Sequence, residues 1–285
     1  MQVIRENIYY EDQYPGVTLG AIIQPRGTLM IDAPLRAEDA RTWRSVLMSQ
    51  SRGTHRLLIN LDTHTDRALG TRAMECTTLA HSSAGEAFEN RAAIFKGQNT
   101  ESSAEWENYP EVIGSRWTRP HLTFSHQISL HWGDFEIRIE HQPGPMPCSV
   151  WVNIPEHQVI FVGDAVTPDQ PPFLANADLE TWLAGLDLLL SKEYKNYTIV
   201  SGRGGPTSPE AVREQRRLIK AIQQKVEKLA ERNVEPYETE KLIPAIMKNI
   251  AHPTRLEDFY TQRLRYGLYQ YYLRQYGPNE PEPEE

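Results

Sequence analysis

The sequence is poor in cysteine, and this scarcity excludes two ways of holding a chain together. Only Cys76 and Cys148 occur in 285 residues. Two cysteines cannot form a disulfide framework, and the chain contains no Cys-x-x-Cys pair of the kind that marks structural zinc. A reducing compartment is therefore the expected location.

Long apolar segments and excess positive charge are also missing. No run approaches the roughly 20 apolar residues that span a bilayer, and the first five residues, MQVIR, lack the apolar core of a signal peptide. The chain has 38 acidic and 30 basic residues, for a formal net charge of −8. A negative field of this kind disfavours DNA, RNA or an anionic membrane as partner. We expect a cytoplasmic protein with no nucleic-acid partner and no membrane partner.

What is present is the pattern of a single α/β body followed by helices. Short apolar runs typical of strands occur at 17–23, 28–31, 56–60, 121–130, 135–140, 149–154, 158–162 and 197–200. Helices are expected at 37–48 and 178–190, then at 208–232, 238–250 and 256–272. We predict a body over residues 1–207, C-terminal helices over 208–276 packed on it, and a disordered Pro/Glu tail over 277–285.

An irregular insertion interrupts the body at residues 97–120, which are rich in Glu, Ser, Asn and Pro. Trp106, Trp117 and Phe124 lie in or near it and are expected to cover a pocket. The strand-forming runs resume directly afterwards.

Five short polar motifs follow strand-like runs in a distinctive order. They are IDAP at 31–34, NLDTHTDR at 60–67, GPMPCS at 144–149, FVGD at 161–164 and SGRG at 201–204. This order, over roughly residues 5–220, resembles the metallo-β-lactamase superfamily. The resemblance implies a four-layer αββα sandwich, here with a helical C-terminal extension.

The resemblance also implies a metal site, which this sequence preserves only in part. In the superfamily, a His-x-His-x-Asp-His loop, two further histidines and a bridging aspartate hold metal ions that activate water for hydrolysis. The matching positions here are Asp62, His64, Asp66, Arg67, Pro145, Asp164 and Arg203. Arg67, Pro145 and Arg203 stand at histidine positions and cannot ligate a metal. Proline has no side-chain donor atom, and arginine stays protonated.

The two family metal positions are affected unequally. At the second, Arg67 and Arg203 stand beside Asp66 and Asp164, so two guanidinium charges are expected to replace an ion. At the first, a set of one histidine and two carboxylates remains, and such a set can hold one zinc, iron or manganese ion. His141 or Cys148 could supply a further ligand there.

Our leading interpretation is a superfamily member with a degenerate metal site and no cofactor. It would lack standard metal-dependent hydrolase activity, and its arginine-lined pocket would either bind a small anionic ligand or simply hold a salt-bridge network. Arg67 and Arg203 would contact that anion, and His64 and His81 would line its pocket. Asp32 matches the family's structural aspartate at a strand end.

Two alternatives stay open. The first is a mononuclear hydrolase of the same superfamily, with Asp62, His64 and Asp164 as ligands and Asp66 as general base. The second is a non-catalytic interaction protein that forms a homo-oligomer through its C-terminal helices. Loss of activity on chelation would identify the first, and concentration-dependent assembly the second.

Overall fold

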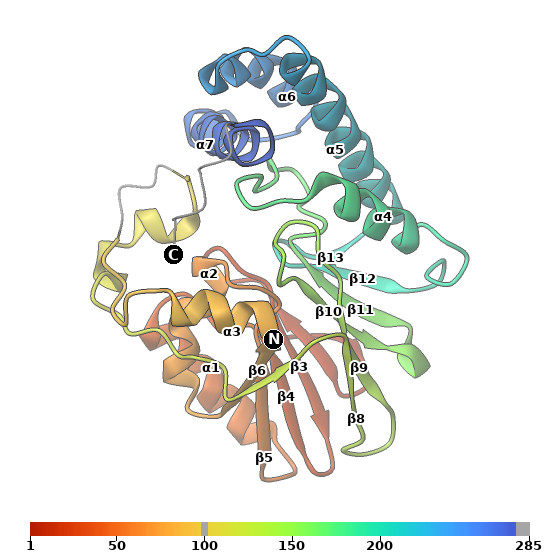
Figure 1. Ribbon diagram of the computed structural model, residues 1–285. Coiled ribbons are helices and arrows are strands. Elements are labelled where there is room, and N and C mark those ends of the chain that lie inside the picture. The colour runs from red at the N-terminus through yellow and green to blue at the C-terminus, as the bar shows by residue number, and fades with distance from the viewer. Residues whose placement is uncertain (98–101, 278–285) are drawn as a thin grey trace, which may run out of the picture.

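Two mixed β-sheets pack face to face in the computed structural model, which describes residues 1–97 and 102–277. Helices α1 (Ala37–Gln50) and α3 (Ser82–Glu89) lie outside the first sheet, and α4 (Leu179–Leu189) lies outside the second (Figure 1). The four layers therefore run helix, sheet, sheet, helix. This arrangement is the αββα sandwich that the motifs predicted.

The first sheet has seven strands in sequence order, antiparallel from β1 to β4 and parallel from β4 to β7. Its strands are β1 (Gln2–Arg5), β2 (Ile8–Glu11), β3 (Leu19–Gln24), β4 (Gly27–Ile31), β5 (His55–Ile59), β6 (Thr77–His81) and β7 (Leu122–Phe124). The parallel strands β4 to β6 end at the same edge, and the loops that follow them carry the polar motifs.

The second sheet has six strands in the order β13-β12-β11-β10-β9-β8. They are β8 (Gln127–Leu130), β9 (Ile137–His141), β10 (Val150–Ile154), β11 (Val159–Gly163), β12 (Thr198–Ser201) and β13 (Gly205–Thr207). Only β11 and β12 pair in parallel, so their following turns also lie at one edge.

Alternation along the strands builds the central core. Ile22 and Ile31 from the first sheet meet Val152 and Phe161 from the second in one buried cluster. Because successive strand residues face opposite ways, neighbours of these residues point outward, and Met30 packs in a separate cluster beneath α1.

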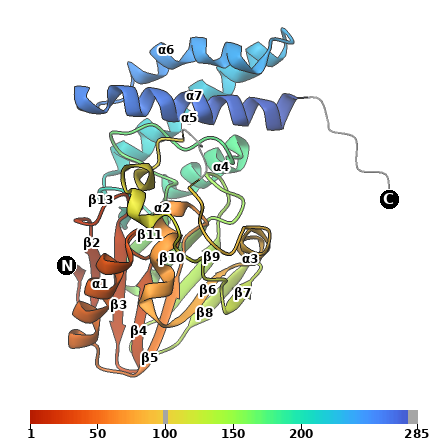
Figure 2. The ribbon, with the colours of Figure 1, turned by 90° about the vertical axis from the view of Figure 1, so that its left-hand side faces the viewer.

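The C-terminal helices cover the second sheet's outer side and one end of the sandwich (Figure 2). They are α5 (Pro209–Ala230), α6 (Ile243–Met247) and α7 (Glu257–Tyr276). Their apolar residues form one cluster with α4 and with the outward side chains Trp151 and Ile160. Within residues 1–97 and 102–277, no helix has the length and apolarity needed to cross a membrane.

Three details differ from the expectations. The run 121–130 forms two strands, since β7 joins the first sheet and β8 the second. The expected helix at 238–250 begins as a 3-10 turn, Pro236–Leu242, before α6. Strands β1, β2 and β13 were not predicted, because runs of three or four residues carry little periodicity. The tail from 278 onward lies outside the described residues.

Candidate functional site

Polar loops from both sheets converge at one edge of the sandwich. Asp32 follows β4, Asp62 and His64 follow β5, and the short helix α2 (Thr65–Ala68) carries the next polar residues. The turns after β11 and β12 approach closely: a Cβ on Gly202 would lie 2.7 Å from the carbonyl carbon of Gly163. Glycine at 202 thus allows the two turns to bring their polar residues together.

Arg67 lies at the centre of this edge and is completely buried. Its Nη1 donates to Asp32 Oδ2 at 2.6 Å, and its Nη2 donates to Asp164. Its Nε lies 2.9 Å from Asp62 Oδ1, close enough for an ion pair although it makes no hydrogen bond there. One guanidinium group therefore pairs with carboxylates from three different loops.

Arg203 joins the same carboxylates from the second sheet. Its Nε and Nη2 donate to Asp164 at 3.2–3.3 Å, and its Nη1 donates to Asp66 Oδ2 at 3.0 Å. The guanidinium carbon also lies 4.5 Å from the centre of the Phe173 ring. We call Asp32, Asp62, Asp66, Asp164, Arg67 and Arg203 the salt-bridge cluster.

The pKa values of the carboxyl groups in the salt-bridge cluster are shifted in opposite directions. Burial alone would raise the pKa of Asp164, but Arg203 and Arg67 outweigh burial and hold that pKa well below its usual range. Burial raises the pKa of Asp32 to about 7 despite Arg67, and burial likewise raises the pKa of Asp62. The two guanidinium groups thus do not offset the effect of burial on the pKa of all four carboxyl groups.

Asp66, expected as a general base in the hydrolase alternative, is fully engaged. Besides Arg203, its carboxylate accepts the backbone N–H groups of Glu105 at 3.0 Å and Trp106 at 2.9 Å. Burial would raise the pKa of Asp66, but His64, Arg203 and these N–H groups lower it overall. The residue ties the insertion to the loop after β5.

His64 is held neutral with a defined acceptor nitrogen. Burial lowers the pKa of His64 to about 4, although Asp66 opposes the shift. Its Nδ1 accepts from the Asp66 backbone N–H at 3.3 Å and lies 3.3 Å from Arg203 Nη2. Both neighbours are donors, so the ring proton belongs on Nε2.

The arrangement does not fit a divalent ion. Among residues 1–97 and 102–277, no three His, Cys, Asp or Glu side chains are grouped to hold a metal. The carboxylate oxygens that would face a divalent ion are instead paired with the guanidinium groups of Arg67 and Arg203. Of the two suggested extra ligands, His141 has its Nε2 2.8 Å from the Pro147 carbonyl. Cys148 lies beside Thr63, with its Sγ 3.5 Å from the hydroxyl oxygen, and burial raises the pKa of its thiol to about 11.

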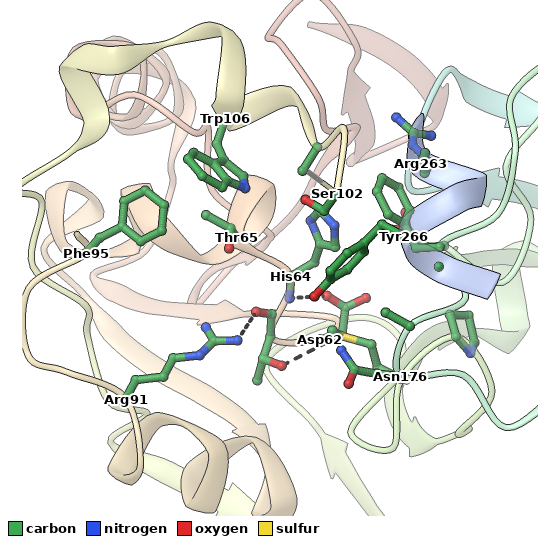
Figure 3. Close-up of a pocket in the computed structure, with 18 of the residues that line it drawn as sticks. Asp62, His64, Thr65, Arg91, Phe95, Ser102, Trp106, Asn176, Arg263 and Tyr266 are labelled. Carbon is green, nitrogen blue, oxygen red and sulfur yellow. Dashed lines mark hydrogen bonds between the residues drawn. The ribbon is translucent and has the colours of Figure 1, made fainter. Parts of the chain in front are cut away.

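A cavity of about 380 Å³ lies over the cluster (Figure 3). Asp62, His64 and Asp164 form part of its floor, while Trp106 and Trp117 contribute to its wall as expected. Its other lining residues include Thr63, Thr65, Arg91, Phe95, Lys96, Ser102, Pro145, Met146, Phe173, Leu174, Asn176, Arg263 and Tyr266. The volume and mainly apolar lining suit a small molecule.

Several expected pocket residues are placed differently. Arg67 and Arg203 are not on this wall, because both are sequestered by carboxylates below it. His81 stacks on His141 at 3.6 Å between ring centres and contacts Ser125 instead of the cavity. Phe124 packs in the core between the sheets.

Sequence reasoning missed two arginines that do line the cavity. Arg91 follows α3, and Arg263 projects from α7. Arg91 had no motif around it, and Arg263 lies in a helix that we interpreted as core or oligomer contact. Their role depends on contacts made across the fold, which no local pattern shows.

Comparison with known proteins gives structural matches only. No family model and no curated protein matches the sequence. The stereoselective inverting sec-alkylsulfatase Pisa1 from Pseudomonas sp. matches with a TM-score of 0.70 and 15% identity, over 99% of this chain and 52% of its own. The chain thus spans about half the length of that sulfatase.

Two β-lactamases match over most of their own length. One, from Pontibacter korlensis, has a TM-score of 0.57 at 15% identity, covering 75% of this chain and 93% of its own. The DIM-1 metallo-β-lactamase has a TM-score of 0.59 at 16% identity, covering 77% and 96%. With the layer order and the converging loops, these matches establish that the chain has the metallo-β-lactamase fold.

Proposed function

We propose that this chain is a metal-independent, ligand-binding protein built on the metallo-β-lactamase fold. It holds no dinuclear centre, performs no standard metal-dependent hydrolysis, and binds a small anionic molecule in the cavity above the salt-bridge cluster. The observation that carries the proposal is the position of Arg67 and Arg203, whose guanidinium groups lie among the carboxylates that the family uses for metal.

Two arginines fill the electrostatic role of a cation but not its chemical role. They neutralise Asp66 and Asp164 through directed hydrogen bonds. Neither offers an open coordination position or lowers the pKa of a bound water, which are the features that make a metal site hydrolytic. Their positive charge also repels an incoming cation.

The charge of the cavity supports an anionic ligand. Asp62 and Asp164, its acidic lining residues, are already paired with arginine. Arg91 and Arg263 have no carboxylate within ion-pair distance in the part of the chain that the structure describes. The free charge facing the cavity is therefore positive.

The alternative of a mononuclear hydrolase draws on the structural neighbours, which are named as a sulfatase and β-lactamases. It would require Asp62, His64 and Asp164 to exchange their arginine partners for one zinc, iron or manganese ion. Of the three, His64 has the fewest competing contacts, because only Nδ1 is committed.

The alternative of an interaction protein rests on helix α7. Tyr269, Leu273 and Tyr276 expose 38–41% of their surface there, and a homo-oligomer through these helices would cover them. Light scattering at several concentrations distinguishes this alternative, since it requires a mass above the 32.7 kDa of one chain.

Elemental analysis tests the proposal directly. Protein purified without a His-tag or chelator should contain zinc, iron and manganese far below one ion per chain, and its melting temperature should not change with chelator or added zinc. One tightly bound ion per chain, with activity lost in the His64→Ala variant, would replace our proposal with the mononuclear hydrolase.

A further inference from the structure

Arg91 has hydrogen-bonding capacity that the described protein does not use. Its Nη2 donates to the Thr63 carbonyl at 2.9 Å, and a dashed line from Arg91 in Figure 3 marks this hydrogen bond. Its Nη1 is buried and has no hydrogen-bond partner within residues 1–97 and 102–277. A buried donor without a partner costs about 1–3 kcal/mol, and more when it is charged.

Aromatic rings fix the orientation of this guanidinium group. Its central carbon lies 5.0 Å from the centre of the Phe88 ring and 4.6 Å from that of Trp117. Both distances are within the range of cation–π attraction. With Thr63 holding one nitrogen, Arg91 is pre-organised and needs little reordering when a partner arrives.

Arg263 offers no comparable opening. Its Nε and Nη2 donate to the Ser103 carbonyl, and its Nη1 donates to Gln170 and to the Pro171 carbonyl. It is 3% exposed and holds α7 against the insertion. Of the two arginines on the wall, Arg91 is the one that keeps a donor without a partner among residues 1–97 and 102–277.

The wall near Arg91 is aromatic. Trp117 contacts Arg91 itself, and Phe95 packs edge-on against Trp117 and Trp106, with ring centres 5.5 Å and 4.8 Å away. These rings line the same cavity. A planar apolar group placed there would bury aromatic surface while an attached anion reached Arg91.

We infer that the cavity binds a small aromatic carboxylate, whose carboxylate pairs with the Arg91 guanidinium group and whose ring packs on Phe95 and Trp106. This inference rests on the proposed function and specifies its ligand class and anchor. A carboxylate supplies the charge that Arg91 lacks and matches the planar fork of a guanidinium group. Arg91 is therefore a binding residue, not a structural cation.

Isothermal titration calorimetry with two ligands of matched shape tests the inference. 1-Naphthoate carries the carboxylate, and 1-naphthamide replaces it with a neutral amide. We expect naphthoate to bind at least tenfold more tightly. Arg91→Gln should remove that preference and weaken naphthoate binding by about tenfold to a hundredfold, the range for a charged hydrogen bond.

Two further variants keep the result specific. Arg91→Lys retains charge without the planar fork, so it should recover part of the preference for naphthoate. Arg232→Gln removes an exposed arginine just beyond α5 that does not line the cavity, and it should bind like the wild type. Melting temperatures of all variants verify that they are folded.

The other outcomes overturn the inference in distinguishable ways. Equal binding of naphthoate by folded Arg91→Gln and wild type would remove Arg91 as anchor while leaving an anion-binding cavity. Absence of naphthoate binding, or equal affinity for the amide, would refute the ligand class. Binding that appears only after loading with zinc would refute the proposed metal-independent function itself.

Discussion

Removal of Arg67 should destabilise the protein strongly, since it leaves three carboxyl groups without their shared cation. Methionine at this position keeps an unbranched apolar stem and removes the charge. Arg67 makes two hydrogen bonds to carboxylates, each contributing about 1.5–3 kcal/mol. The two bonds together give about 3–6 kcal/mol, and breaking a buried ion pair by deleting one partner costs about 3–5 kcal/mol, so the two figures agree on a loss of about 3–5 kcal/mol.

That loss is large enough to measure by thermal unfolding. For domains of this size, 1 kcal/mol moves the melting temperature by roughly 2–4 °C, so Arg67→Met should lower it by about 6–20 °C at pH 8. The deficit should narrow toward pH 5, because protonated carboxyl groups no longer need the cation.

Arg216→Met is the matched control for this experiment. Arg216 also pairs with a carboxylate, Asp187, but both side chains are substantially exposed. Exposed pairs contribute about 0–1 kcal/mol, so this variant should melt within a few degrees of the wild type. If Arg67→Met had the same melting temperature as Arg216→Met, the salt-bridge cluster would not hold the loops together and our account of the site would fail.

Three further changes probe other parts of the site. His64→Gln should resist acid better than the wild type: the unfolded histidine takes up its proton near pH 6.5 but the folded one only near pH 4, so the wild type loses up to about 3 kcal/mol as pH falls through that window. Urea unfolding at pH 7 and pH 4.5 measures this, and parallel losses in both proteins would contradict it. Asp66→Asn should weaken the bonds to the Glu105 and Trp106 N–H groups and speed proteolysis of the insertion, whereas unchanged cleavage would refute that link. Arg67→His combined with Arg203→His should take up about one zinc by elemental analysis, and a folded, zinc-free double variant would refute the replacement argument.

The sequence predicted the layers and the converging loops because these depend on local patterns. Alternating apolar residues mark strands such as β4 and β5, and the motifs at 60–67 and 161–164 sit where parallel strands end. The pairing of Arg67 and Arg203 with carboxylates also follows from chemistry, since neither can ligate a metal. The order of the motifs was enough to predict that these residues lie close together.

The wall of the cavity was less predictable because it depends on contacts between distant segments. Arg91 is identified by what surrounds it: Trp117 and Thr63 are 26 and 28 positions away in the sequence. That its Nη1 has no hydrogen-bond partner within residues 1–97 and 102–277 can be read only from the three-dimensional structure. The stacking of His81 on His141 likewise joins strands of different sheets. No periodicity or motif encodes such encounters.

Under our proposal, guanidinium groups take the place of metal ions, and the charge available to a ligand lies on the wall of the cavity and not on its floor. A divalent ion neutralises carboxylates and still has open positions for water, whereas Arg203 spends its donors on Asp164, Asp66 and the Gly16 carbonyl. Arg67 is completely buried, and its Nη1 and Nη2 donate to Asp32 and Asp164. The two guanidinium groups therefore hold the carboxylates of the floor in place. Within residues 1–97 and 102–277, Arg91 keeps one donor without a partner beside an aromatic wall, and in our proposal it is this residue, outside the positions that match the family's ligands, that recognises the anion.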